Sequence, residues 1–236
     1  MTFAFAALII LVASIVQGAT SFGFSLLALP LLSFFFDIKV VVPALVCFSL
    51  VLNLMILIKL KLKPDIKLLL PLVIFATLTI PIGVKALILI DEHLLKQLVS
   101  GILLMVSLLM FFGVKIYFKN KWITYSIAGI ISGVLNGSVS LSGPPIVVLL
   151  SNEGVSRDDF RATLSSLFFI LNIITIVMYA QGGLLINLQL YKLLYLTPIM
   201  IVGTFMGIYL GNKINEVFFK RLVLLMLMAM SIINLI

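Results

Sequence analysis

The sequence predicts an all-α polytopic membrane protein made of two inverted repeats, each a re-entrant or broken helical hairpin plus three transmembrane helices. Of its 236 residues, 63% are hydrophobic and only 10% are charged. That balance excludes a soluble globular domain. Apolar segments with short polar breaks follow one another along the whole chain, and similar residues recur in its two halves. Together these observations predict the fold class.

Six apolar segments have about the length of a membrane-spanning helix. A helix needs roughly 20 residues to cross a hydrocarbon core of roughly 30 Å. These spans are expected at 40–58, 68–84, 94–114, 162–180, 190–210 and 217–236.

Four shorter apolar segments form two pairs, 3–17 with 21–36 and 122–136 with 142–151. Small polar linkers join the members of each pair, GATS in the first and the NGSVSLS region in the second. A helix of about 15 residues is only about 22 Å long, which is too short to cross. Each pair is therefore one broken span or a hairpin that enters and leaves on the same side.

The distribution of basic residues favours hairpins. If each pair is a hairpin, or two full crossings, twelve of the 16 Lys and Arg residues share one side; a single second span would give eight on each side. By the positive-inside rule, the side with more basic residues is cytoplasmic. The basic residues then determine the topology, so they indicate no nucleic-acid partner. We expect a multi-pass protein of the cell membrane with both termini outside. The twelve are Lys59, Lys61, Lys63, Lys67, Lys115, Lys119, Lys121, Arg157, Arg161, Lys213, Lys220 and Arg221.

An internal repeat divides the chain into 1–119 and 120–236. The first repeat would contain a hairpin at 3–36 and the second a hairpin at 122–151, each followed by three spans. An odd number of crossings inverts one half relative to the other, which is a transporter signature. The matching segments are ILIDEHLLKQLV (88–99) with NKINEVFFKRLV (212–223), Asn53 with Asn172, and, at a common offset of 115, Gly18 with Gly133 and Pro30 with Pro145.

The segment ISGVLNGSVSLSGPPIVVL (131–149) predicts half of a substrate site, and 17–25 predicts the other half. Irregular, polar backbone at membrane depth persists only where it is buried in protein or lines a wet cavity. A helix that begins at the midplane offers free N–H groups and its positive dipole end to an anion. Pro144 suits such a start, and Gly137 and Gly143 would allow an oxyanion close to backbone amides.

The hairpin tips supply most of the predicted substrate-binding residues. The alternative for these small residues is tight helix packing, and for Ser25 and Ser140 the two interpretations are balanced. Asn53 and Asn172 are either ligand contacts or interhelical clamps, whereas Ser49 is expected to be a packing serine. The predicted set is Gln17, Thr20, Ser21, Asn136, Gly137, Ser138, Ser142, Gly143 and Pro144, with Asn53 and Asn172.

The sequence indicates no catalytic centre, metal site or cofactor. Ser142 and Gly143 superficially resemble a serine-hydrolase motif, but that chemistry needs a nearby base. The only histidine, His93, falls in a predicted outer loop. No Asp, Glu, Lys, Arg or His lies clearly inside a span, apart from residues near the ends, which favours uncoupled or voltage-driven movement and leaves sodium coupling open.

Two segments resemble the signatures of the TauE/SafE sulfite-exporter family, also called the TSUP family of membrane permeases. They are GATSFGFSLLALPLL (18–32) and SGPPIVVLL (142–150). The R-x-T-L that begins at Arg161 and the G-x-x-x-G of Gly203 and Gly207 fit its second half. The resemblance implies transport of sulfite, sulfonates or related organic anions, commonly outward. Because the family motif includes an arginine there, Arg161 is a candidate for anion steering.

We therefore expect a secondary transporter or facilitator that moves small sulfur-containing anions by alternating access between the hairpin tips. Its expected partners are the anionic substrate and the lipid bilayer. The oligomeric state stays open, with a homodimer as one option. The alternative is a membrane scaffold or assembly subunit without a transported substrate.

Overall fold

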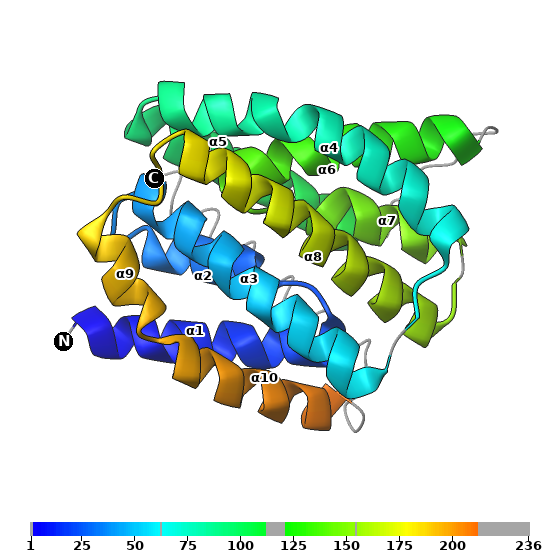
Figure 1. Ribbon diagram of the computed structural model, residues 1–236, viewed down its shortest axis with the longest axis horizontal. Helices are drawn as coiled ribbons and strands as arrows, with labels where there is room; N and C mark the ends of the chain where they lie inside the picture. The colour runs from blue at the N-terminus through cyan, green and yellow to red at the C-terminus, as the bar shows by residue number, and fades with distance from the viewer. Residues whose placement is uncertain (1, 62, 112–120, 154, 212–236) are drawn as a thin grey trace.

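The computed structural model describes residues 2–61, 63–111, 121–153 and 155–211, and the regular structure within these ranges is entirely α-helical (Figure 1). The predicted span at 217–236 and the repeat segment at 212–223 lie outside the described residues. The helices are α1 (Thr2–Thr20), α2 (Phe24–Leu32), α3 (Ile38–Leu60), α4 (Ile66–Leu89), α5 (Glu92–Phe111), α6 (Lys121–Val139), α7 (Gly143–Glu153), α8 (Arg157–Gln181), α9 (Leu188–Leu194) and α10 (Thr197–Gly211).

Several of these helices are long and apolar enough to cross a membrane. Within the described ranges they are α1, α3, α4, α6 and α8, and α9 with α10 makes a sixth when that bent pair is one span. The predicted span at 190–210 is thus bent by 40° between α9 and α10. Pro198 explains the bend, because in a continuous helix its ring would clash with the carbonyl of Leu194, where α9 ends, and because a proline suits the first turn of a new helix. The chain is a multi-pass membrane protein.

The breaks inside the two hairpins are shorter than the polar linkers suggested. α1 continues to Thr20 and α6 continues to Val139, so each break contains only three residues, 21–23 and 140–142. Both helices have 19 residues and are long enough to cross a membrane, so the prediction that these two segments are too short to cross is wrong. Each break opens with a serine in the left-handed region, Ser21 at φ 66° and Ser140 at φ 59°.

Backbone hydrogen bonds explain how the α6 helix ends. The N–H groups of Ser140 and Leu141 donate to the carbonyls of Asn136 and Leu135, both at 3.1 Å. The first of these two bonds is the one that commonly terminates a helix at a left-handed residue, a position where glycine is usual. A serine in that conformation is held by its surroundings.

Each hairpin returns to the side on which it begins. Lys121 at the start of α6 and Glu153 at the end of α7 form an ion pair, with 2.7 Å between Nζ and Oε2. In the first hairpin, the rings of Phe3 and Phe36 lie edge to face with their centroids 6.1 Å apart. A single broken span would have placed these ends on opposite sides.

The two halves interlock through their hairpins. α1 of the first half lies along α10 of the second half, α6 of the second half lies along α4 of the first half, and α3 packs against α8 (Figure 1). Glycines allow the close approach. A Cβ added to Gly207 would lie 2.2 Å from the carbonyl oxygen of Ile15, and one added to Gly133 would lie 2.1 Å from that of Ala76. Such small residues let helix backbones meet.

Helix positions in the two halves match at one constant spacing. α1 and α6 begin at residues 2 and 121, α2 and α7 at 24 and 143, and α3 and α8 at 38 and 157, a difference of 119 each time. Asn53 and Asn172 fit this spacing, but the pairings at 115, Gly18 with Gly133 and Pro30 with Pro145, do not. On α6 the glycines at 129, 133 and 137 recur every four residues, about one helical turn. The glycine pairing at 115 is four residues short of the spacing of 119, and for this reason it still matches a glycine with a glycine.

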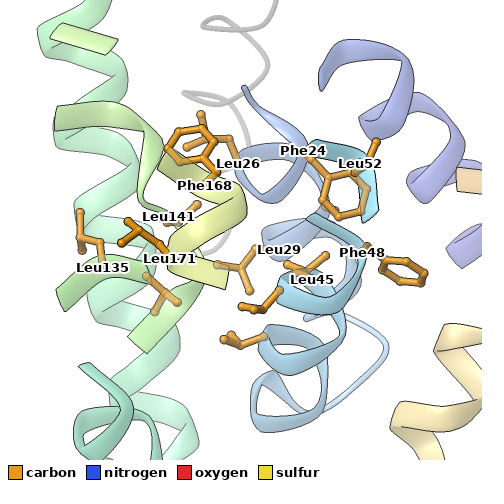
Figure 2. Packing of buried hydrophobic residues seen from close by; sticks show 14 of the residues in the cluster. Phe24, Leu26, Leu29, Leu45, Phe48, Leu52, Leu135, Leu141, Phe168 and Leu171 are labelled. Atoms are coloured by element: carbon orange, nitrogen blue, oxygen red, sulfur yellow. The ribbon is translucent and has the colours of Figure 1, made fainter. Parts of the chain in front are cut away.

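Buried apolar side chains from both halves surround the breaks (Figure 2). The first half contributes from α2 and α3, and the second half contributes from α6, α8 and the second break. This packing holds irregular backbone inside protein, as membrane depth requires. The labelled members are Phe24, Leu26, Leu29, Leu45, Phe48, Leu52, Leu135, Leu141, Phe168 and Leu171.

Candidate functional site

A small cavity lies where the two breaks meet α3 and α8. Its volume is about 30 Å³, which is room for about two waters, since one water needs roughly 10–15 Å³. Amides and hydroxyls dominate its polar lining, which contains no ionisable side chain among the described residues. The lining residues are Gln17, Gly23, Ser25, Leu26, Ser49, Asn53, Asn136, Ser140, Leu141, Ser142, Gly143, Phe168 and Asn172.

The second break contacts the first turn of α2 directly at the cavity. The Ser25 Oγ and Ser140 Oγ atoms are 3.0 Å apart, and both side chains are buried. Ser25 lies in the first turn of α2, and Ser140 opens the second break. Residues 115 positions apart thus form one hydrogen bond between the halves.

The amide groups of the first half are bonded to one another. Gln17 donates from Nε2 to Asn53 Oδ1 at 3.1 Å, and its own Oε1 accepts the N–H of Phe24 at 3.1 Å. Asn53 donates from Nδ2 to the carbonyl of Ser49 at 2.7 Å. The first hairpin is thereby fastened to α3, and one N–H at the start of α2 is already occupied.

The second half is bonded differently. Asn136 donates from Nδ2 to Thr175 Oγ1 at 2.8 Å. Asn172 also lines the cavity and is only 1% exposed, yet its Nδ2 has no hydrogen-bond partner in the described part of the chain. A buried donor without a partner costs about 1–3 kcal/mol. A hydrogen-bond acceptor that entered the cavity could relieve this cost.

The helices α2 and α7 both begin at the cavity, but they offer few free N–H groups. The first four residues of α7 include Pro144 and Pro145, which have no N–H. Only Gly143 and Ile146 can donate from that first turn. The positive, amino-terminal end of the α7 dipole still faces the cavity. It offers fewer backbone N–H groups than the predicted substrate site required. Pro144 itself is buried outside the cavity lining.

The other predicted residues outside the lining hold the breaks in shape. Thr20 and Ser138 each donate their hydroxyl to the carbonyl four residues earlier, at 2.9 Å and 2.8 Å. Gly137 packs against α4, where an added Cβ would lie 2.5 Å from a backbone oxygen. The cavity brings together Gln17, Asn53, Asn136, Ser142, Gly143 and Asn172, and leaves out Thr20, Ser21, Gly137, Ser138 and Pro144.

Arg161 lies inside the protein against the first break. It is 3% exposed, and it donates from Nε to Ser21 Oγ at 3.1 Å and from a terminal nitrogen to the carbonyl of Gly18 at 2.8 Å. This differs from the cytoplasmic surface position expected for a steering residue. A cation at the carboxyl end of α1 is favourable for the helix dipole.

Comparison with known families now identifies the chain. Residues 6–233 match the family described as Sulfite exporter TauE/SafE. The chain belongs to this family. No curated protein and no solved structure matches it. The resemblance of 18–32 and 142–150 to TauE/SafE signatures is confirmed, and both segments end up around the cavity.

Two residues that line the cavity of this TauE/SafE protein, Ser49 and Phe168, are not among the predicted site residues. Ser49, expected to be a packing residue, lies one helical turn before Asn53 and shares its face. That spacing could have identified it. Phe168 carries no comparable signal, because an apolar ring in a span looks like any other core residue.

Proposed function

We propose that this TauE/SafE protein is a secondary transporter or facilitator that moves sulfite, a sulfonate or a related small sulfur-containing anion across the cell membrane, in the outward direction. The substrate passes through the cavity between the hairpin breaks by alternating access. The observation that carries the proposal is a cavity lined by amides and hydroxyls at the breaks, with the buried Nδ2 of Asn172 unpartnered among the described residues. Membership of a sulfite-exporter family supports the substrate class.

An uncharged lining suits an anion that must both enter and leave. Hydroxyls of Ser142 and Ser49 and the amide of Asn172 replace part of the hydration shell. A fixed cation in the lining would hold the anion more strongly, whereas passage requires binding weak enough for release. A cavity of about 30 Å³ must widen to admit a four-atom oxyanion, so the described state is contracted.

The membrane potential is the proposed driving force. The lining has no ionisable side chain among the described residues to relay protons. With the inside negative, anion efflux gains roughly 2.3 kcal/mol per charge per 100 mV. Alternating access would follow from the two halves acting as inverted repeats, with equivalent positions 119 residues apart and hairpins that enter from opposite faces.

Sulfite uptake into proteoliposomes tests this function. We expect Asn172→Ala and Ser142→Ala each to reduce the initial rate about tenfold or more, because a hydrogen bond to an ion is worth about 1.5–3 kcal/mol and 1.4 kcal/mol is tenfold. Ser14→Ala is the matched control, since Ser14 is a buried serine of the first hairpin that bonds its own helix and lies outside the lining. Wild-type rates in both cavity variants would contradict the proposed site.

A further inference from the structure

Two pairs of amide side chains occupy equivalent positions in the two halves. At the spacing of 119, Gln17 on α1 corresponds to Asn136 on α6, and Asn53 on α3 corresponds to Asn172 on α8. All four side chains are at least 97% buried and line the same cavity. In each half, one amide lies in the last turn of the hairpin's first helix and the other lies in the following span.

The pairs are equivalent in position but not in bonding. Gln17 donates to Asn53 at 3.1 Å, so the first pair is closed. In the second pair, Asn136 donates instead to Thr175 at 2.8 Å, and the Nδ2 of Asn172 is unpartnered among the described residues. If the amides served only as interhelical clamps, both pairs would be expected to close, because an unsatisfied buried donor costs free energy.

We propose that the two pairs are alternating positioning contacts. In the described state the Gln17–Asn53 bond holds the first hairpin against α3. In the oppositely facing state this bond opens and an Asn136–Asn172 bond holds the second hairpin against α8. The proposal rests on the proposed function, since it assumes that the two halves exchange conformations during transport.

The exchange requires only a small displacement. Thr175, the present partner of Asn136, is three residues from Asn172 and lies on the same face of α8. Three residues correspond to about 4.5 Å along a helix axis. The second hairpin would therefore slide by less than one turn on α8. The exchange breaks the Gln17–Asn53 and Asn136–Thr175 bonds and forms the Asn136–Asn172 bond. If Asn172 Nδ2 is the donor of that new bond, the unsatisfied donor of the described state gains a partner, so the two states can stay close in free energy, as a transporter cycle requires.

The accessibility of a cavity cysteine tests the proposal without measuring transport. In a Cys47→Ala background, which removes the natural thiol, Ser49→Cys places a reporter in the lining. Its labelling rate with a membrane-impermeant thiol reagent is measured in right-side-out and inside-out vesicles. Gln17→Ala should destabilise the described state, and Asn172→Ala should destabilise the opposite state.

The two substitutions should shift the ratio of labelling rates in opposite directions, each by roughly two- to tenfold, as the loss of one neutral hydrogen bond implies. Ser14→Ala should leave the ratio unchanged. Shifts in the same direction, or none, would overturn the proposal. If Gln17→Ala does not fold, Asn53→Ala removes the other partner of the same bond and is judged by the same criterion.

A protection experiment separates this inference from the proposed function. A small sulfonate is added during labelling, because sulfite itself consumes thiol reagents. Opposite shifts with protection support both proposals. Opposite shifts without protection support the alternating contacts and count against the anion site. Protection without opposite shifts supports the anion site and overturns the alternating contacts.

Discussion

Gly207→Ala and Gly133→Ala are expected to destabilise the protein severely, each by about 1–3 kcal/mol or more. A methyl group at these positions would lie 2.2 Å and 2.1 Å from backbone oxygens of α1 and α4. Backbone cannot rotate away as a flexible side chain can. The α1–α10 and α4–α6 pairs would separate, and these pairs hold the two hairpins in place. Thermal unfolding and the fraction of monodisperse protein in gel filtration measure the effect.

Gly101→Ala on α5 is the matched control for these substitutions. An added Cβ there meets no atom within 4 Å. The substitution should be neutral or stabilise the helix by up to about 1 kcal/mol, since alanine is the better helix former. If all three alanine variants unfolded at the same temperature, the close helix contacts described above would be wrong.

Arg161→Ala is expected to abolish most transport and to lower stability. The guanidinium joins α8 to the first break through two hydrogen bonds, to Ser21 and to the carbonyl of Gly18. Hydrogen bonds to charged groups are worth about 1.5–3 kcal/mol each. Their loss should reduce sulfite flux in proteoliposomes by tenfold or more. Lysine should not restore it, because a single ammonium cannot reproduce the fork of the guanidinium.

Two further variants show whether the contact or the charge matters. Ser21→Ala removes only the hydrogen bond between Arg161 and Ser21 and should reduce flux less than Arg161→Ala does. Lys121→Gln removes an exposed positive charge and should transport like the wild type. Full flux in Arg161→Ala, or a larger loss in Ser21→Ala, would show that the arginine does not support the break.

The hairpins and their polar breaks could be predicted from the sequence more accurately than the residues at which the helices end. Long apolar runs and clustered polar residues are local signals, so the hairpins and the polar breaks were predictable. The breaks proved shorter because Thr20 and Ser138 bond to carbonyls of their own helices and so tolerate helical backbone. Nothing local marks that choice, because these residues also favour turns.

The composition of the cavity was predictable, whereas the bonding within it was not. Polar amide side chains within apolar segments are a clear local signal, and the four in this cavity are Gln17, Asn53, Asn136 and Asn172. Which amide bonds which depends on how two helices lie against each other. Arg161 illustrates the same limit: its partner Ser21 is 140 residues away. Its position near the start of an apolar run therefore suggested a surface role.

A crosslink between Ser25 and Ser140 tests most directly whether the two hairpins meet at the substrate path. Cysteines at both positions, in the Cys47→Ala background, would replace oxygen atoms that are 3.0 Å apart. We expect oxidation to form an intramolecular disulfide, detectable by mass spectrometry, and to stop the flux of a small sulfonate, which does not cleave disulfides as sulfite does, until a reductant restores it. The single-cysteine variants should not respond. Absence of the disulfide, or full flux in the crosslinked protein, would contradict the account.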